Sequence, residues 1–486
     1  MNKKLLIGAA ALIVSTSTFA GGLLTNTNQN ATYLRNPARD AVIAIDGVYS
    51  NPAGIAFLPE GFHFSLSWQA AFQKREMNAT NNLFKMNTNN PNADRKFVGE
   101  STAPVIPSFQ AAYVFNDKWS VSAQFAIGGG GGKCEFADGL PMFEEMIGGK
   151  LAGAKAQSYS LNQNLTGEQY FYGIQVGGTY KVTDNVSVFG GLRGVIANCS
   201  YVGQISNMKA NDMEASAYLT GVSQQATAGS QQAAAAATQY AQAGMTAEAA
   251  QYNAMAQGYA DAAKEAAAGA LLMGSPLVLD CSQKGFGLTP IVGVDVNLGN
   301  LNLAAKYEFR TKIALENESN NSANLAALAT QVPAVAVYAD GAEVRSDIPA
   351  LMTLGAQYSL SSVRIGAGFH YYWDKDAKGS ATAVSDNTWE ALLGVEWDTT
   401  DKLTLSCGGL RTQYGFDDAD MTDTGFNISS YGLCIGAAYQ INDMLKVNAG
   451  YLHSFYDNHE FTNANGTVCD YTRKNDVVGV SLDFKF

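Results

Sequence analysis

Basic side chains are the residues of this sequence that could do the most specific chemistry. Arg193, Lys306 and Arg310 lie in segments where apolar and polar residues alternate, on the face opposite the apolar one. A guanidinium can bind a carboxylate through two parallel N–H donors, so these residues are candidates for holding an anionic headgroup. The alternative is that they pair with acids such as Glu308 and Asp40, because buried charges are usually paired. The sequence leaves both interpretations open.

Catalytic and metal-binding patterns do not occur in the sequence. The four histidines are scattered, the six cysteines show no CxxC spacing, and no serine–histidine–acid pattern stands out. We therefore expect no enzymatic activity, no cofactor and no metal. The formal net charge of −12 and the lack of a basic cluster argue against nucleic-acid binding.

The first twenty residues predict export. Lys3 and Lys4 precede the apolar run LLIGAAALIV, and small residues lead to Gly21. This is the order of a secretory signal peptide, whose apolar core is too short to cross a membrane as a helix. We expect residues 1–20 to be removed, and the six cysteines suit the oxidising compartment that export implies.

Alternation of apolar and polar residues is the main structural signal in the rest of the chain. It occurs in fourteen segments, at about 61–73, 105–115, 119–128, 168–182, 186–199, 284–297, 301–312, 348–360, 363–374, 387–398, 402–414, 427–440, 444–457 and 474–486. Tight turns and long links alternate between them, as in an outer-membrane barrel with short periplasmic turns and long outer loops. The sequence predicts a 14-stranded antiparallel transmembrane β-barrel over residues 61–486. Both termini are then periplasmic.

Aromatic residues near the predicted strand ends separate this interpretation from a secreted β-sandwich or solenoid, which would also alternate. They are typical of the girdles at the two membrane interfaces, and comprise Trp119, Tyr180, Trp373, Trp389, Trp397 and Tyr439. The chain also ends on an aromatic residue, Phe486, in an alternating strand. A terminal aromatic is a signal for the barrel assembly machinery, which we expect to be a partner.

Residues 21–60 precede the first predicted strand and match no strand themselves. They contain many apolar residues, among them Val42, Ile45, Val48, Ile55 and Phe57, which argues against a free periplasmic tail. A lumen inside fourteen strands is too wide for wall side chains to fill. We therefore expect this segment to fold back into the barrel as a plug. Within it, Asn51 can cap a helical turn that begins at Pro52.

The motif Asn51-Pro52-Ala53-Gly54, within VYSNPAGIAFLPEG, resembles the plug signature of the outer-membrane long-chain fatty-acid transporters, the FadL/TodX family. The stretch STAPVIPSFQAAYVFNDKWSVSAQFAIGGGGG is similar to the second and third strands of that family. IPALMTLGAQYSL and IGAGFHYYWDKDA extend the resemblance. It implies a 14-stranded barrel, an N-terminal hatch and a third strand that bends inward and leaves a hole in the wall.

A run of five glycines ends the predicted third strand: Gly128, Gly129, Gly130, Gly131 and Gly132. Glycine permits bulges and positive φ, so the strand can break its ladder here and turn inward. We expect these residues to form a lateral gate through which a hydrophobic solute reaches the membrane. The alternative is that the glycines only begin a flexible outer loop.

Residues 205–280 form an Ala/Gln-rich extracellular insert. These residue types favour helix, and a break near 244–246 predicts two antiparallel helices. Tyr252, Met255 and Tyr259 share one stripe of the second helix at helical spacing. The stripe could capture a hydrophobic ligand at the barrel mouth, or it could pack within the helical hairpin.

Two cysteines flank this insert, Cys199 at the end of the fifth predicted strand and Cys281 before the sixth. Adjacent antiparallel strands would bring them close, so we expect a disulfide at the base of the insert. Cys407 and Cys434 flank a later loop, but the alternation puts them on opposite faces, and we expect no bond between them.

Together with the resemblance, these patterns predict an outer-membrane transporter for passive uptake of long-chain fatty acids or similar hydrophobic compounds. Aromatic hydrocarbons are a variant of the same interpretation. We expect the protein to work as a monomer, in contact with outer-membrane lipid. Two alternatives stay open, a general diffusion porin for small hydrophilic solutes and a surface adhesin that uses the helical insert.

Overall fold

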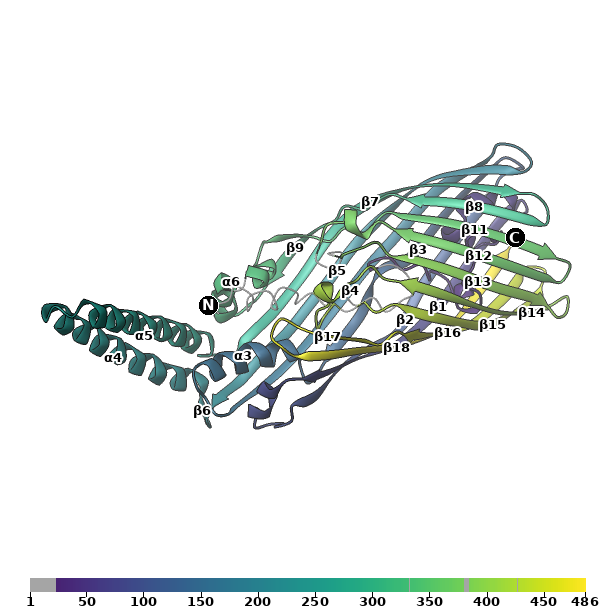
Figure 1. Ribbon diagram of the computed structural model, residues 1–486. Coiled ribbons are helices and arrows are strands. Elements are labelled where there is room, and N and C mark those ends of the chain that lie inside the picture. The colour runs from purple at the N-terminus through teal and green to yellow at the C-terminus, as the bar shows by residue number, and fades with distance from the viewer. Residues whose placement is uncertain (1–22, 332, 380–383, 426) are drawn as a thin grey trace.

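The alternating segments form one sheet that closes on itself (Figure 1). The computed structural model describes residues 23–486 except residues 332, 380–383 and 426, so the predicted signal peptide lies outside the described residues. The first strand pairs antiparallel with both the second and the last, which closes the wall. The predicted 14-stranded antiparallel barrel is confirmed.

In several places two short strand segments lie end to end and together form one strand of the barrel wall. The strands are β1 (Gly61–Thr80), β2 (Asp94–Val114), β3 (Trp119–Phe136), β4 (Tyr159–Lys181), β5 (Val186–Ala210), β6 (Met213–Glu214), β7 (Leu277–Asn297), β8 (Leu301–Glu308), β9 (Ala314–Ser319), β10 (Glu343–Arg345), β11 (Leu351–Leu360), β12 (Val363–Tyr372), β13 (Trp389–Asp398), β14 (Leu403–Gln413), β15 (Ser430–Asn442), β16 (Leu445–Tyr456), β17 (His459–Thr462) and β18 (Val468–Lys485). β8 and β9 both pair with β7, and β16 and β17 both pair with β18. β10 and β11 pair with β9 and β8 in the same way.

The helices and 3₁₀ turns that follow β1 lie at the end of the barrel where the long connections are, whereas those before β1 lie inside the barrel (Figure 1). They are α1 (Thr32–Arg35), α2 (Gly47–Ser50), α3 (Pro141–Gly153), α4 (Ala215–Gln242), α5 (Thr246–Leu272) and α6 (Ala323–Gln331), with 3₁₀ turns η2 (Pro52–Phe57), η3 (Asn82–Met86), η4 (Pro333–Tyr338), η5 (Asp374–Asp376) and η7 (Asp418–Asp420). Of these, α1, α2 and η2 belong to the segment before β1. The α4–α5 hairpin projects from the loop end, and the short turns and the C-terminus lie at the other end (Figure 1).

The wall near the turn end carries its apolar side chains on the outside. On β1 the large exposed residues Leu66, Trp68 and Phe72 alternate with the buried Ser67 and Gln69. This is the reverse of a soluble domain and is typical of a barrel wall in contact with lipid. Among the described helices, none is both long and apolar enough to cross a membrane.

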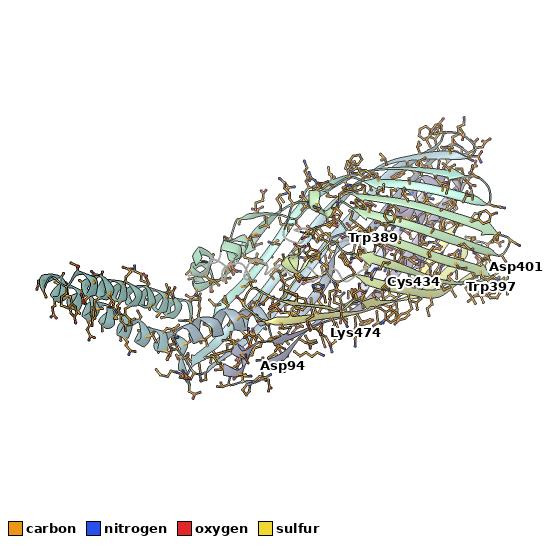
Figure 2. All side chains as sticks on the ribbon, in the orientation of Figure 1. Asp94, Trp389, Trp397, Asp401, Cys434 and Lys474 are labelled. Atoms are coloured by element: carbon orange, nitrogen blue, oxygen red, sulfur yellow. The ribbon has the colours of Figure 1, made fainter. Side chains whose placement is uncertain are left out.

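The height of this apolar belt can be followed on β13. Figure 2 labels Trp389 and Trp397 at its two ends, and Asp401 in the turn beyond. Eight residues of strand separate the two indoles, or about 27 Å at the usual rise per residue. A strand of this length, tilted by about 40°, spans about 20 Å along the barrel axis, which is most of an apolar band of about 25 Å.

The strands on one side of the barrel extend well beyond the belt. β1 to β5 and β7 contain 18 to 25 residues, whereas β11 to β14 contain 10 or 11. The predicted first strand, 61–73, therefore ends too early and the predicted second strand, 105–115, begins too late, because β1 runs to Thr80 and β2 begins at Asp94. Above the belt the alternation inverts, since Lys74 and Glu76 face outward while Met77 is buried.

Inside this tall part the barrel is packed with apolar side chains. The cluster joins the inward faces of the long strands to α3 and includes Met77, Phe97, Phe136, Ile147, Tyr159, Leu165, Phe171 and Tyr201. The interior is therefore divided along the barrel axis. An apolar region lies at the loop end, and the region toward the turn end is polar and charged.

Candidate functional site

Residues 23–58 lie inside the barrel, and nearly all of them are buried. Asn51 ends α2 and caps η2, because its Oδ1 accepts a hydrogen bond from the Gly54 N–H at 3.2 Å. The same amide donates from Nδ2 to Asp295 Oδ2 on β7 at 2.5 Å. A Cβ atom at Gly54 would lie 2.4 Å from Asn51 Nδ2, so the cap requires glycine at this position.

The carbonyls of the same motif bind the barrel wall. Pro52 O accepts a hydrogen bond from Thr179 Oγ1 on β4 at 2.9 Å, and Ala53 O accepts one from Ser187 Oγ on β5 at 2.7 Å. Asn51, Pro52, Ala53 and Gly54 are all buried. The motif therefore connects the inner segment to three neighbouring strands, β4, β5 and β7.

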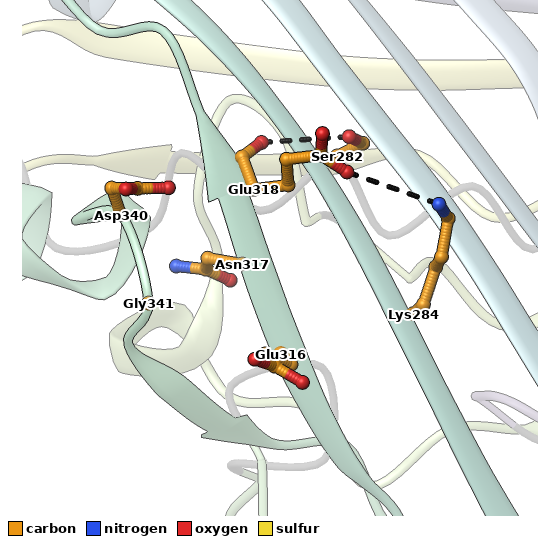
Figure 3. A pocket seen from close by; sticks show the side chains of 7 residues that line it. All are labelled: Ser282, Lys284, Glu316, Asn317, Glu318, Asp340 and Gly341. Atoms are coloured by element: carbon orange, nitrogen blue, oxygen red, sulfur yellow. Dashed lines mark hydrogen bonds and ion pairs between the residues drawn. The ribbon is translucent and has the colours of Figure 1, made fainter.

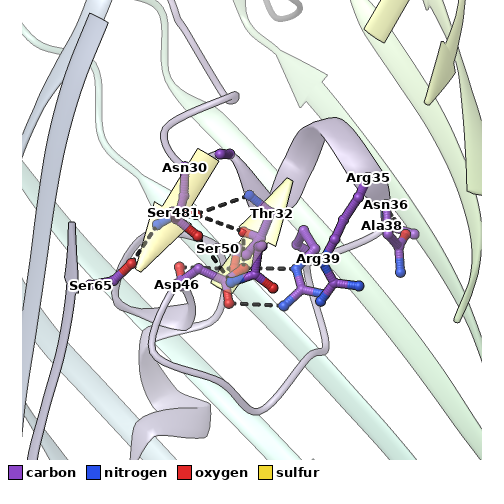
Figure 4. Close-up of polar contacts among 12 residues, drawn as sticks. Asn30, Thr32, Arg35, Asn36, Ala38, Arg39, Asp46, Ser50, Ser65 and Ser481 are labelled. Atoms are coloured by element: carbon purple, nitrogen blue, oxygen red, sulfur yellow. Dashed lines mark hydrogen bonds and ion pairs between the residues drawn. The ribbon is translucent and has the colours of Figure 1, made fainter. Parts of the chain in front are cut away.

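A second part of the inner segment binds the opposite wall through ion pairs. Glu396 on β13 accepts from Arg35 at 2.7 Å and from Arg39 at 2.9 Å. Arg39 also pairs with Asp46 at 2.7 Å, and Thr32 donates to the same carboxylate at 3.0 Å (Figure 4). These side chains are buried, and each of the charges has an oppositely charged partner.

Glycines in this wall make room for the inner segment. A Cβ atom at Gly394 on β13 would lie 1.8 Å from Asn36 Oδ1, and one at Gly408 on β14 would lie 2.5 Å from Pro37 Cδ. Gly394 pairs directly with both Gly366 and Gly408 across the sheet. The second Asn-Pro-Ala copy, residues 36–38, therefore packs against a track of wall glycines.

His370 adds a third link between this wall and the inner segment. One ring nitrogen lies 2.9 Å from Glu390 Oε2, and the other lies 3.1 Å from Asp40. Tyr372 donates to the same Glu390 at 2.7 Å. The sequence analysis missed this network, and the only signal for it was the presence of polar residues on the inward face of β12 and β13.

The β2–β3 ladder is interrupted beside the glycine run. It proceeds regularly from the turn end as far as Ser108 opposite Ala126, stops, and resumes with Ser101 opposite Cys134. On the β2 side the interrupted stretch contains Pro104 and Pro107, which have no N–H to donate. The two strands are therefore joined above and below an opening in the hydrogen-bonded wall.

The glycines displace β3 inward at this opening. The β3–β4 ladder shows two register shifts there, and Gly130 and Gly132 have φ values of 81° and 72°. A Cβ atom at Gly129 would lie 2.1 Å from the carbonyl oxygen of Leu24. Glycine is required by backbone conformation at two positions and by close approach of the inner segment at another.

The inner segment holds the displaced strand from inside. The Asn26 N–H donates to Gly128 O at 2.9 Å, and Asn26 Nδ2 donates to Ile127 O at 3.0 Å. Ile127 belongs to a buried apolar cluster with Ala103 and Ile106 of β2. The opening thus has apolar side chains on its inner side and the apolar belt on its outer side.

The three basic candidates do not form one site. Arg193 and Lys306 meet at Glu308, with ion pairs of 2.6 and 2.8 Å, and Lys306 Nζ also donates to Tyr49 O at 2.8 Å. Arg310 lies apart, where it pairs with Asp347 at 3.9 Å and donates to the carbonyl oxygen of Asp376. Arg193 and Lys306 are therefore arranged as the ion-pair interpretation expects, since both bind Glu308 inside the barrel.

The outer candidates lie on the helical hairpin, and two of them pack within it. Tyr252 stacks on Tyr240 of α4 with ring centroids 5.1 Å apart. The ring of Tyr259 lies 3.3 Å from where a Cβ of Gly229 would be. Met255 is 44% exposed, and so is Tyr259.

The expected disulfide at the base of the hairpin is wrong. The β5–β7 register pairs Cys281 with Tyr201 and Cys199 with Gln283, so the two cysteines are offset by two residues. Both are buried and free, and the other four cysteines of the described chain are also free, with Cys407 exposed and the rest buried. The described residues also contain no group of three or more His, Cys, Asp or Glu that could hold a metal ion.

A polar pocket of about 400 Å³ opens beside β7 and β9 at the loop end (Figure 3). Its lining is Ser282, Lys284, Glu316, Asn317, Glu318, Asp340 and Gly341. The Lys284–Glu318 pair across it measures 3.8 Å and is largely exposed. A surface of this composition offers little to an apolar ligand.

Comparison with known proteins supports the architecture. A profile of the Gram-negative porin family matches residues 291–459, from within β7 to the start of β17. No curated protein sequence matches the chain. The match identifies part of the wall as porin-like and covers less than half of the chain.

Solved structures extend the likeness over nearly the whole length. A Pseudomonas aeruginosa FadL homologue is 15% identical with a TM-score of 0.61, and the match covers 95% of this chain and 99% of that one. The P. putida toluene transporter TodX is 13% identical with a TM-score of 0.55, and the match covers 92% of this chain and 95% of that one. The Ralstonia pickettii toluene transporter TbuX is 13% identical with a TM-score of 0.51, and the match covers 93% of this chain and 98% of that one.

These similarities define the protein first as a closed 14-stranded antiparallel barrel, part of whose wall matches the Gram-negative porin profile. More particularly, the chain has the fold of a FadL homologue and of two toluene transporters. The resemblance expected from the Asn51 motif and the glycine run is thus confirmed at the level of the fold.

Proposed function

We propose that this protein is an outer-membrane channel for the passive uptake of hydrophobic compounds, long-chain fatty acids among them. The observation that carries the proposal is the interrupted β2–β3 ladder, which lies between an apolar interior and the apolar outer belt. A solute leaves sideways through this opening into the membrane. The helices and long loops face the outside, and both ends of the barrel chain face the periplasm.

Lateral exit has a simple energetic basis. Bringing an alkyl chain into water costs about 0.8 kcal/mol per CH₂, or roughly 12 kcal/mol for sixteen carbons. The polar lower lumen is filled by residues 23–58, so a path straight through the barrel would cross buried ion pairs. The route through the wall avoids both costs.

The comparisons support the proposal by analogy, because the fold is shared with proteins named as a FadL homologue and as toluene transporters. Fold alone does not establish function. The agreement that matters is between the shared fold and the opening that this chain builds at its own glycines.

The decisive experiment straightens β3. Alanine at Gly130 and Gly132 disfavours the positive φ values that the inward turn requires, by about 1–2 kcal/mol each. We expect the double variant to take up labelled oleate several-fold more slowly in intact cells at equal amounts of folded barrel. The matched control is Gly178→Ala with Gly190→Ala, where an added Cβ meets no close contact. Uptake equal to that of the control would refute lateral exit.

The porin interpretation deserves its own test because the family match is to porins. A barrel blocked by residues 23–58 should show almost no steady current in a planar bilayer. A large, stable conductance of the unmodified protein would favour diffusion of small hydrophilic solutes instead.

A further inference from the structure

Two tyrosines of β4 lie on the membrane face of the wall, beside the opening in the β2–β3 ladder. Phe171 between them is buried inside the barrel, and Ile174 farther along the outer face is 50% exposed. Tyr170 and Tyr172 share the outer face with Ile174, because successive side chains of a strand alternate between its two sides. Both tyrosines are nevertheless partly buried, since they pack against the cluster that contains Ile127. The two rings therefore belong to the opening rather than to the apolar belt.

Ile127 forms the floor of the opening, beneath these rings. Its place in the alternation of β3 puts it on the outer face with Val121, which is 45% exposed, yet only 4% of Ile127 is exposed. β3 recedes at this point, and Ile127 is paired directly with Tyr172 of β4. An outward-facing side chain of the wall becomes this buried when neighbouring side chains close over it. The tyrosines of β4 therefore cover the recessed strand from the membrane side.

Stacked aromatic rings form a row along the opening. The ring centroid of Tyr172 lies 6.4 Å from that of Phe125 on β3, with an interplanar angle of 9°, and 5.8 Å from that of Tyr170, at 21°. A Cβ atom at Gly132 would lie 3.7 Å from Tyr170 Oη and 3.5 Å from Ala103 Cβ on β2. The hydroxyl group of Tyr170 thus reaches past β3 to the edge of β2, and the row of rings spans the opening.

The backbone on either side of the opening is fixed. On β2, Pro104 and Pro107 restrict the chain, and Trp68 Nε1 on β1 donates to Pro104 O at 3.1 Å. On β4, the ladder to β5 runs without a register shift from Asn162 to Lys181. The side chains of the two tyrosines can therefore rotate without breaking a backbone hydrogen bond, and such rotations are fast in partly exposed residues.

We propose that Tyr170 and Tyr172 form a shutter over the lateral opening, which a solute displaces into the membrane as it leaves. Stacking favours the closed arrangement, because offset aromatic rings attract one another. A slender alkyl chain passes with little rotation of the rings, whereas a fused-ring solute requires both rings to turn away and lose their contacts. The two tyrosines thus select slender hydrophobic solutes over bulky ones. The inference rests on the proposed lateral exit and adds the residues that discriminate among hydrophobic compounds.

The test compares two labelled ligands, oleate and a fatty acid that carries pyrene at the end of its chain, taken up by intact cells at equal amounts of folded barrel. Tyr170→Ala with Tyr172→Ala should raise pyrene uptake several-fold relative to oleate, because the shutter is gone. Tyr170→Phe with Tyr172→Phe should keep the ratio of the unmodified protein, because both rings remain. The matched control is Ile174→Ala with Val176→Ala, on the same face of β4 but exposed to the membrane, which should also keep that ratio.

Two outcomes would overturn the shutter. One is an alanine variant with the same uptake ratio as the control, and the other is a phenylalanine variant that behaves like the alanine variant. If the alanine variant does not fold, Tyr170→Val with Tyr172→Val keeps strand-forming residues at both positions and must give the same increase. Unmodified protein that takes up oleate while no variant changes the ratio contradicts the shutter alone. Unmodified protein that takes up neither ligand contradicts the proposed function itself, which separates the two failures.

Discussion

Two parts of the wall meet the inner segment through glycine, with opposite consequences. At β3 the glycines take positive φ, the ladder to β2 is interrupted, and the strand moves inward. At β12, β13 and β14 none of the facing glycines has a positive φ, and the ladders run without a register shift. The first group uses the conformational freedom of glycine, whereas the second uses only its lack of a side chain.

The contrast suggests how one segment can serve both a closed and an open stretch of wall. On the β12–β14 side the inner segment is held by buried ion pairs and close packing. On the β3 side it makes two hydrogen bonds from Asn26. We infer that the first side is an anchor and that the second side controls the opening.

The largest effect should come from breaking the anchor. Glu396→Gln removes the acid that joins Arg35, Arg39 and Arg364. We expect the free energy of unfolding to fall by about 3–5 kcal/mol, because the buried Arg35 loses its acidic partner and the buried Arg39 loses one of two. Thermal unfolding in detergent followed by circular dichroism measures this.

The control for that variant is Glu318→Gln, which removes an exposed pair with Lys284 (Figure 3). An exposed pair contributes at most about 1 kcal/mol. If the two variants unfold at the same temperature, the inner segment is not anchored at Glu396.

A smaller effect should follow from filling the glycine track. Gly394→Ala places a methyl group against Asn36, which we expect to cost about 1–3 kcal/mol and to loosen the inner segment. Intermittent current in a planar bilayer would report the loosening. Gly190→Ala on β5, where an added Cβ meets nothing within 4 Å, should stay silent. If neither variant shows intermittent current, the glycine track does not support the inner segment.

Removing the contact between Asn26 and β3 should change only the backbone near the opening. Asn26→Ala removes the buried hydrogen bond to Ile127 O, worth about 1 kcal/mol. We expect faster hydrogen exchange at residues 127–133. Asn28→Ala, which loses a buried hydrogen bond to Gln69 on β1, should lower stability by a similar amount without that local change. Equal exchange in both variants would show that Asn26 does not control β3.

The smallest effect concerns the loop that connects the short-strand side with α3. Asp423 accepts hydrogen bonds from Met142 N at 2.7 Å and from Tyr471 Oη at 2.6 Å, and burial raises the pKa of its carboxyl to about 6. The folded protein then holds a proton that the unfolded chain releases near pH 4. Stability from this proton is complete below that pH and is lost as the pH rises through 6.

The thermal midpoint should therefore fall slightly between about pH 4 and about pH 6. Asp423→Asn should reduce this slope, whereas Asp401→Asn, in an exposed turn at the other end, should keep it. An unchanged slope in the Asp423 variant would assign the pH dependence to other groups.

Alternation and loop length determined the barrel and its strand number, because lipid demands an apolar exterior and a closed ladder regardless of detail. The sequence reading ended the first strand at residue 73, near the point where the apolar face changes sides. Lys74 meets water outside the lipid while Met77 packs inside the barrel. Only the structure shows at which residue of the strand the apolar face changes from the outside to the inside of the barrel.

The residues of the site divide in the same way. The glycine run and the Asn51 motif could be recognised from sequence, since each depends on local backbone chemistry. The pairing of Arg193 with Glu308 and the offset of Cys199 from Cys281 depend on strand register. Register is set by contacts between distant segments, and a shift of two residues preserves every side chain's face while changing all of its partners.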